Sequence, residues 1–131
     1  MIQYLEENKN PRGILWATVK NPKVLPEPKY ENTFHLHTTF QFNVKRDDWE
    51  DYIGMVFKGI GKWNTWNDEI QAVKVILPFP LRKISKNENP HITISAKTGV
   101  KPVKSNDMLL GDFNKELLDK EIEFEIEFKE F

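Results

Sequence analysis

Two short His-x-Thr triplets hold the residue types best suited to chemistry in this chain. They occupy residues 37–39 and 91–93, and they contain two of the three histidines. Histidine titrates near neutral pH, so one imidazole can accept a proton while another donates one. Threonine hydroxyls can donate hydrogen bonds to oxygens on which negative charge develops. The two triplets therefore predict acid-base chemistry at a phosphorus centre, for which no metal or cofactor is needed.

The sequence around each triplet is typical of a β-strand with one apolar and one polar face, because side chains alternate along a strand. Over residues 33–42, apolar side chains dominate the even positions, and the histidine and threonine of the triplet share the odd, polar face. Residues 91–97 show the same alternation. The polar face of residues 121–131 is instead mostly glutamate, as expected of a solvated strand. The two triplet strands are thus distinguished by neutral hydrogen-bonding groups.

The remaining periodicity predicts an α+β domain with an antiparallel or mixed sheet. We expect strands at residues 13–19, 33–42, 69–79, 91–97 and 121–131. Three- and four-residue spacing predicts a helix over residues 47–60, and a second, shorter helix is expected within residues 105–118. The proline-rich residues 21–32 and the segments 62–68 and 85–90 are predicted to be loops.

Composition limits the class of protein. The 131 residues fit a single domain spanning residues 1–131, and 39% apolar residues are enough for a packed core. The absence of cysteine excludes disulfides and thiolate chemistry. A net charge of -1 argues against binding to duplex DNA. No apolar run is long enough for a membrane span, and residues 1–10 are too polar for a signal peptide. We therefore expect a cytoplasmic protein, and a monomer.

Further side chains are candidates for substrate binding. One is a histidine on the polar face of the first triplet strand, three are lysines after the second triplet, and three are aromatic rings that could stack on a base. These candidates are His35, Lys97, Lys101, Lys104, Trp63, Trp66 and Tyr30. More often, such lysines simply lie on the surface and such tryptophans belong to the core. No metal site is expected, because His35 and His37 have no evident carboxylate partner.

The segments FHLHTTFQF and PHITISAKTGVKPVKSNDMLL resemble the motif regions of the two-histidine (2H) phosphoesterase superfamily. The branch they resemble contains 2′,3′-cyclic-nucleotide 3′-phosphodiesterase and the cyclic phosphodiesterase domain of fungal tRNA ligases. The resemblance implies that His37 and His91 are the acid-base pair and that Thr39 and Thr93 bind the phosphate. It also implies a compact bilobal fold, in which two antiparallel sheets form a V-shaped cleft with helices outside.

The resemblance implies a metal-independent hydrolase that opens a 2′,3′-cyclic phosphate, on a nucleoside or an RNA 3′ end, to the 2′-phosphate. By the same likeness, His91 activates water and His37 serves the leaving oxygen, although the residues themselves leave these roles interchangeable. Compact 2H proteins of viral or bacterial type suggest an alternative, the hydrolysis of cyclic di- or oligonucleotide signals. A second alternative is a non-catalytic nucleotide-binding module, against which the two intact triplets argue.

Overall fold

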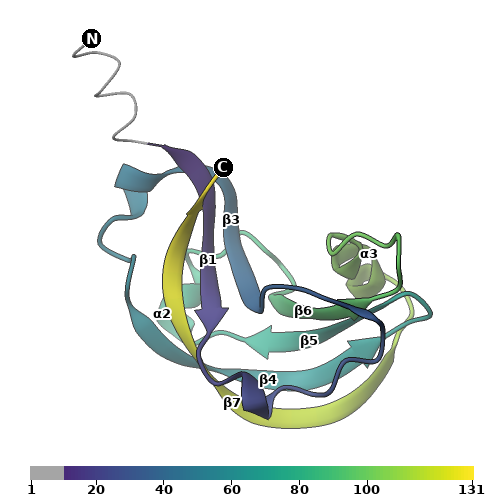
Figure 1. Ribbon diagram of the computed structural model, residues 1–131. Helices are drawn as coiled ribbons and strands as arrows, with labels where there is room; N and C mark the ends of the chain where they lie inside the picture. The colour runs from purple at the N-terminus through teal and green to yellow at the C-terminus, as the bar shows by residue number, and fades with distance from the viewer. Residues whose placement is uncertain (1–10) are drawn as a thin grey trace.

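The computed structural model describes residues 11–131, and about half of them lie in one antiparallel sheet of seven strands (Figure 1). The strands are β1 (Arg12–Val19), β2 (Asn32–Thr33), β3 (His37–Lys45), β4 (Val56–Trp66), β5 (Ile70–Ile76), β6 (His91–Ala96) and β7 (Asn114–Glu130). Their order in the sheet is β2-β6-β5-β4-β7-β1-β3. The helices are α2 (Phe79–Arg82) and α3 (Lys104–Leu110), and two short 3₁₀ helices are η1 (Pro22–Val24) and η2 (Arg46–Trp49).

The long strand β7 joins the two parts of the sheet. It pairs with β4 from Asn114 to Glu125 and with β1 from Phe124 to Glu130. Figure 1 shows the result, a curled half-barrel in which β1 and β3 run across the direction of β4, β5 and β6. Two separate sheets, as the resemblance implied, are therefore not observed, because β7 is hydrogen-bonded on both sides and keeps the sheet continuous. The broader expectation of an antiparallel α+β fold holds.

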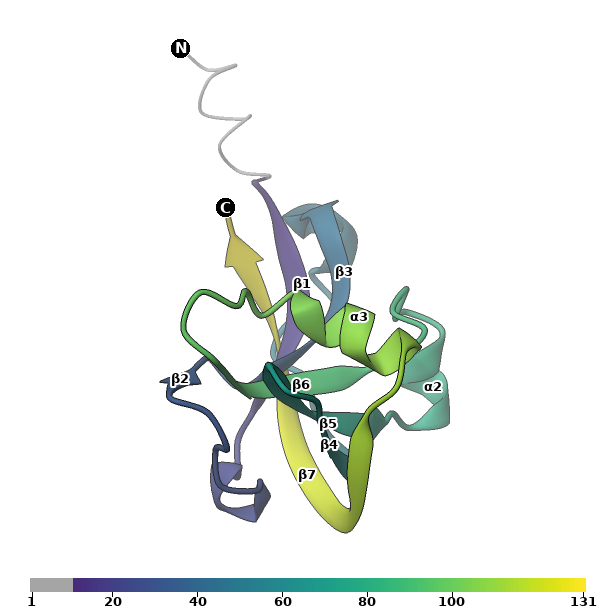
Figure 2. The same ribbon diagram turned by 90° about the vertical axis from the view of Figure 1, so that its right-hand side faces the viewer.

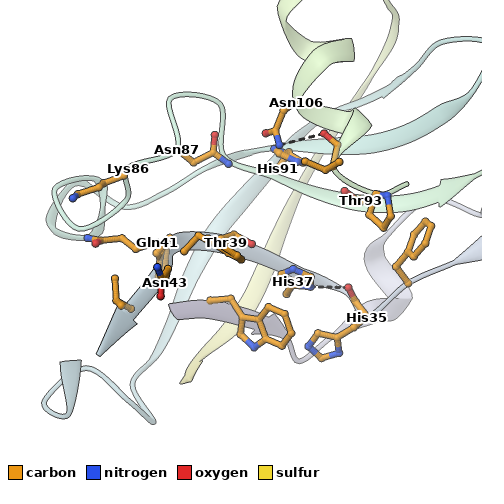
Figure 3. A pocket seen from close by; sticks show the side chains of 17 residues that line it. His35, His37, Thr39, Gln41, Asn43, Lys86, Asn87, His91, Thr93 and Asn106 are labelled. Atoms are coloured by element: carbon orange, nitrogen blue, oxygen red, sulfur yellow. Dashed lines mark hydrogen bonds between the residues drawn. The ribbon is translucent and has the colours of Figure 1, made fainter. Parts of the chain in front are cut away.

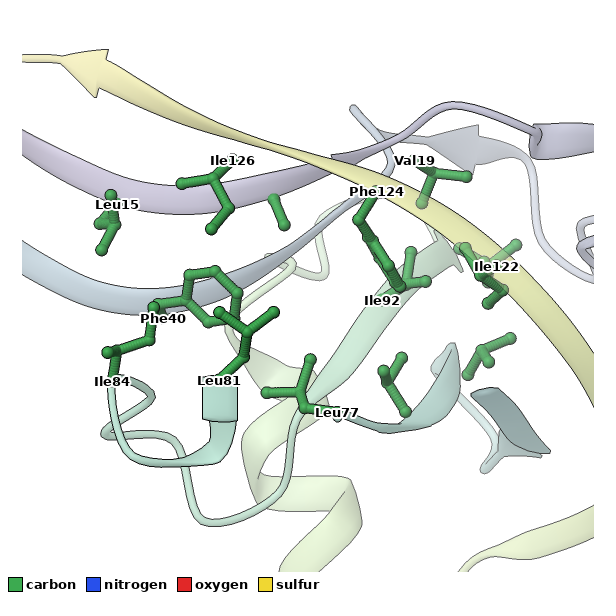
Figure 4. Close-up of a cluster of buried hydrophobic side chains, with 14 residues drawn as sticks. Leu15, Val19, Phe40, Leu77, Leu81, Ile84, Ile92, Ile122, Phe124 and Ile126 are labelled. Carbon is green, nitrogen blue, oxygen red and sulfur yellow. The ribbon is translucent and has the colours of Figure 1, made fainter. Parts of the chain in front are cut away.

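The main hydrophobic core fills the inside of the curl (Figure 4). It contains apolar side chains from β1, β3, β5, β6 and β7, together with residues in and around α2. The alternation predicted for the triplet strands is confirmed for Phe40, Ile92 and Ile94, which are buried here while the histidines line the cleft, but Phe42, predicted on the apolar face, is 69% exposed. A smaller cluster of Ile70, Ala96, Met108 and Leu109 packs α3 against β5 and β6. Figure 2 shows α3 next to these strands. Helix α3 thus covers the outer face, next to the second triplet.

The helix predicted over residues 47–60 is wrong. Only η2 and a turn form there, and β4 begins at Val56 and continues through most of the predicted loop at residues 62–68. Trp49 and Tyr52 do pack against the core, which accounts for their helix-like spacing. The strand is favoured instead because β4 pairs with both β5 and β7, and such tertiary pairing overrides a weak local signal.

Two other predicted boundaries also shift. The strand predicted over residues 33–42 is divided, since β2 ends at Thr33 and β3 begins at His37. The division arises because β2 pairs with β6 whereas β3 pairs with β1, so residues 34–36 carry the chain from one part of the sheet to the other. The helix expected within residues 105–118 ends at Leu110, and the chain then enters β7.

Within residues 11–131, none of the helices is long and apolar enough to cross a membrane. Residues 1–10, on which the absence of a signal peptide was argued, lie outside the described part of the chain.

Candidate active site

The two triplets face one another across a cleft of about 770 Å³ (Figure 3). Strand β3 lies at one end of the strand order and β6 near the other, so the curl of the sheet is what brings them together. The predicted residues His37, Thr39, His91 and Thr93 all line this cleft. Its volume is in the range of small-molecule and cofactor sites.

Each imidazole is held by a hydrogen bond to the backbone carbonyl of the residue two positions earlier. The Nδ1 atom of His37 lies 2.8 Å from the carbonyl oxygen of His35, and Nδ1 of His91 lies 2.8 Å from the carbonyl oxygen of Asn89. A carbonyl oxygen only accepts hydrogen bonds, so each Nδ1 carries the proton and donates it. In the neutral ring, Nε2 then has a free lone pair. Each histidine can therefore accept a proton at Nε2, or donate one from Nε2 once protonated.

The electrostatics of the cleft favour neutral imidazoles in the free protein. The pKa of His37 is lowered to about 4, mainly by burial and also by the nearby His35 and His91, while the hydrogen bond to the His35 carbonyl opposes the shift. Burial also lowers the pKa of His91, against the hydrogen bond to Asn89. Near pH 7 both rings of the free protein are thus mostly neutral, so in the reaction one of them must be protonated after the substrate binds. A bound phosphate anion would raise both pKa values.

The two threonine hydroxyls differ in their surroundings. The Oγ1 atom of Thr93 lies 2.6 Å from Oγ of Ser105, a buried residue of α3, and Ser105 donates to the carbonyl oxygen of Pro102 over 2.8 Å. Because a serine hydroxyl has one hydrogen, Thr93 is the donor in its bond to Ser105. Within the described residues, no hydrogen bond engages the hydroxyl of Thr39. Thr39 is therefore free to donate to a ligand, whereas Thr93 must first leave Ser105.

Trp16 is a site residue that the sequence analysis missed. Its ring packs on His37, with centroids 4.0 Å apart, and on His35 at 4.9 Å. It comes from β1, where it pairs with Thr39 of β3. Alternation along β1 places it opposite the buried Leu15, on the face of the triplets, but only the pairing of β1 with β3 reveals that these faces meet.

His35 lines the cleft as expected, and its role is mainly to hold its neighbours. Its carbonyl group fixes His37, and its Nε2 atom lies 3.1 Å from Oγ1 of Thr18. The Thr18 hydroxyl donates to the carboxylate of Glu127, so His35 Nε2–H is the donor to Thr18. The side chain of His35 is thus engaged outside the reacting centre.

The cleft is lined by further polar groups that were not predicted. They are one lysine and four amides, namely Lys86, Gln41, Asn43, Asn87 and Asn106. Gln41 could have been found from the alternation of β3, on which Asn43 also lies, whereas Lys86 and Asn87 lie in the segment before β6 and Asn106 lies on α3. In the part of the chain that the structure describes, no aspartate or glutamate lines the cleft, and no group of three or more His, Cys, Asp or Glu side chains could hold a metal ion.

The other predicted binding residues do not line the cleft, namely Tyr30, Trp63, Trp66, Lys97, Lys101 and Lys104. The two tryptophans lie on β4, which β5 separates from β6, and each carries a lysine over its ring. Tyr30 donates to the carbonyl oxygen of Asn67 and lies under Lys97. Lys104 forms an ion pair with Asp107 at 3.7 Å. Lys101 is exposed, in the segment that precedes α3.

Comparison with protein families identifies the class as a phosphodiesterase domain. The matching model is that of the fungal tRNA ligase phosphodiesterase domain, and it covers residues 62–130, slightly more than half of the chain. The chain belongs to this family, which confirms the resemblance seen in the sequence. The matched segment holds the second triplet but not the first. His37 therefore lies outside the matched segment, and it is the fold that places it in the same cleft as His91. The comparison with curated proteins gives no match.

Proposed function

We propose that this protein is a metal-independent hydrolase of 2′,3′-cyclic phosphates, and that its substrate is an RNA 3′ end or the corresponding nucleoside cyclic phosphate. The observation that carries the proposal is the matched pair of tethered imidazoles, His37 and His91, on opposite sides of one cleft. The family description, which names a tRNA ligase phosphodiesterase domain, supports RNA as the substrate class.

In the proposed reaction, one histidine accepts a proton from water at Nε2 as the water oxygen attacks phosphorus. The bond from phosphorus to O3′ breaks, and the second histidine, protonated at Nε2, gives its proton to O3′. The products are a 2′-phosphate and a free 3′-hydroxyl group, and the two histidines have exchanged protonation states. Thr39 and Thr93 donate to the non-bridging oxygens as their charge increases. Trp16 and the His35 carbonyl hold the His37 ring in place.

The test is hydrolysis of a 2′,3′-cyclic mononucleotide in the presence of EDTA, with the product isomer identified by chromatography. We expect turnover to the 2′-phosphate, because the two imidazoles supply both proton transfers without a metal. Loss of activity in EDTA that zinc or magnesium restores would contradict this mechanism. Formation of the 3′-phosphate would leave the acid-base pair in place but reverse the leaving oxygen.

The pH dependence should differ between kcat/KM and kcat. The first reports the free enzyme, in which the pKa of His37 is about 4 and that of His91 is below its usual value, so we expect a bell-shaped kcat/KM with its maximum below pH 6.5. A bound phosphate anion favours protonated imidazole, so the kcat maximum should lie about one pH unit higher or more. Initial rates from pH 4 to 9 measure both. Coincident profiles, or a monotonic rise in both, would contradict this account.

A further inference from the structure

The cleft extends along β3 beyond the two histidines. Gln41 and Asn43 follow Thr39 on this strand, and Figure 3 shows them with Lys86 and Asn87 at the end of the cleft away from His35. From Thr39 to Gln41 is two strand residues, or about 6.6 Å, which is on the scale of one nucleotide backbone unit. The segment that carries Lys86 lies beside Phe40 and Gln41, and Asn43 is two residues further along β3. A single cyclic phosphate held between the histidines would not occupy this end.

The segment that carries Lys86 is fixed beside β3. The backbone N–H of Lys86 donates to the carbonyl oxygen of Phe40 over 3.0 Å, and Gln41 Nε2 donates to the carbonyl oxygen of Ile84 over 2.8 Å. Among the residues that line the cleft, Lys86 is the only lysine or arginine, and it forms no ion pair with any described residue. Its exposed side chain lies at the edge of a cleft whose lining contains no carboxylate.

Two asparagines at this end present donors and not acceptors. Asn43 Oδ1 accepts from Arg12 Nε at 2.8 Å, and Asn87 Oδ1 accepts from the backbone N–H of Asn89 at 3.1 Å. Both partners can only donate, so the amide orientations are determined and each Nδ2 is left for a ligand. Arg12 also donates to the carbonyl oxygen of Asn43. Its guanidinium group therefore places a second positive charge next to this residue. Two amide donors and a lysine that forms no ion pair with a described residue make a site suited to an anion.

We propose that this end of the cleft, formed by Lys86, Asn43 and Asn87, is a subsite for a second phosphate. Resting on the proposed function, the inference is that this phosphate is the 5′-phosphodiester of the nucleotide that carries the cyclic phosphate. The preferred substrate is then an RNA 3′ end, and a free cyclic mononucleotide is a poorer one. The exposed ring of Phe42 at the same end can stack on the preceding base.

Turnover of adenosine 2′,3′-cyclic phosphate with and without a 5′-phosphate tests the subsite. We expect kcat/KM of the wild type to be about tenfold higher with the 5′-phosphate, the effect of one charge-assisted contact. Lys86→Ala should lower this ratio to about one to two, and Lys86→Arg should largely keep it. Lys97→Ala is the matched control, since Lys97 lies outside the cleft, and it should keep the wild-type ratio.

Binding provides a readout that does not depend on turnover. By calorimetry, adenosine 2′,5′-bisphosphate should bind the wild type about tenfold more tightly than adenosine 2′-monophosphate, and Lys86→Ala should remove the difference. In plots of the logarithm of the binding constant against the logarithm of salt concentration, the slopes for the two ligands should differ by about 0.7. This is the value expected for one additional phosphate contact on a single strand.

The outcomes separate this inference from the proposed function. Turnover of the mononucleotide with no gain from the 5′-phosphate, in rate or binding, would overturn the subsite and leave the hydrolase standing. A gain in binding without turnover of any cyclic phosphate would support the subsite and overturn the hydrolase. Faster hydrolysis of a cyclic dinucleotide than of the 5′-phosphorylated substrate would overturn the assignment to a linear RNA end.

Discussion

Replacing either His37 or His91 with alanine is expected to lower kcat on a 2′,3′-cyclic phosphate by about a thousandfold or more, within the range of general acid-base catalysis. Each imidazole offers Nε2 to the cleft because its Nδ1 proton is committed to a backbone carbonyl. With either ring missing, the attacking water keeps its proton or O3′ leaves without one. Steady-state kinetics measures the loss, and circular dichroism checks that both variants fold.

His35→Ala is the comparison variant, because His35 is the third histidine and lines the same cleft. Its side chain bonds Thr18, and its carbonyl group, which holds His37, is kept in the variant. We expect a loss of no more than about tenfold, or 1.4 kcal/mol in the barrier. A loss as large as that of His37→Ala would mean that the reacting pair is wrongly assigned.

The double variant His37→Ala with His91→Ala separates an enzyme from a binding module. Residues that act as a unit have strongly non-additive effects, so the double variant should be only slightly slower than either single one. Product affinity should fall much less than the rate. If the protein only binds nucleotides, the wild type itself will show no measurable hydrolysis.

The sequence was sufficient for the two motif strands because strand alternation is a local property. Short runs around His37 and His91 divide into apolar and polar positions, and the buried Phe40 and Ile92 confirm the division. Identical local frames on two strands indicated one shared site. The family resemblance then supplied the roles of the histidines and threonines, which alternation alone could not assign.

The sequence was not sufficient where long-range pairing decides the structure. In β4, helix-like spacing at the start of the segment concealed a strand, whose place is set by β5 and β7 on either side. Gly61 shows the constraint, since a Cβ atom there would lie 2.7 Å from Cδ1 of Ile122. Such a close approach of strand and core is visible only after folding.

Nearness in sequence also misled the choice of basic residues. Lys97 follows the second triplet closely, but His91 begins β6 and Lys97 comes just after its end, which separates them by about 20 Å of extended strand. Lys86 precedes His91 across a turn that folds back against β3, and it lines the cleft instead. The turn hydrogen bonds that place it have no periodic signature in the sequence.

The two threonines should not be equivalent, and valine tests this because it replaces the hydroxyl with a methyl group of similar shape. Loss of one hydrogen-bond donor to developing negative charge typically lowers kcat by about a hundredfold or more, and we expect this for Thr39→Val. Thr93→Val should lower kcat less, by roughly tenfold, because Thr93 gives up its bond to Ser105 before it can donate to phosphate, which reduces its net contribution.

Serine substitutions and Ser105→Ala complete the comparison. Thr39→Ser and Thr93→Ser keep the hydroxyl and should recover most of the rate. Ser105→Ala removes the competing acceptor, so the penalty of Thr93→Val should be larger in that background than in the wild type. If Thr93→Val instead costs more than Thr39→Val in the wild type, Ser105 must donate to Thr93 when substrate is bound. The hydrogen bond from Ser105 to the Pro102 carbonyl would then have to break during the reaction. In that case α3, which carries Ser105, would take part in catalysis in addition to packing against β6.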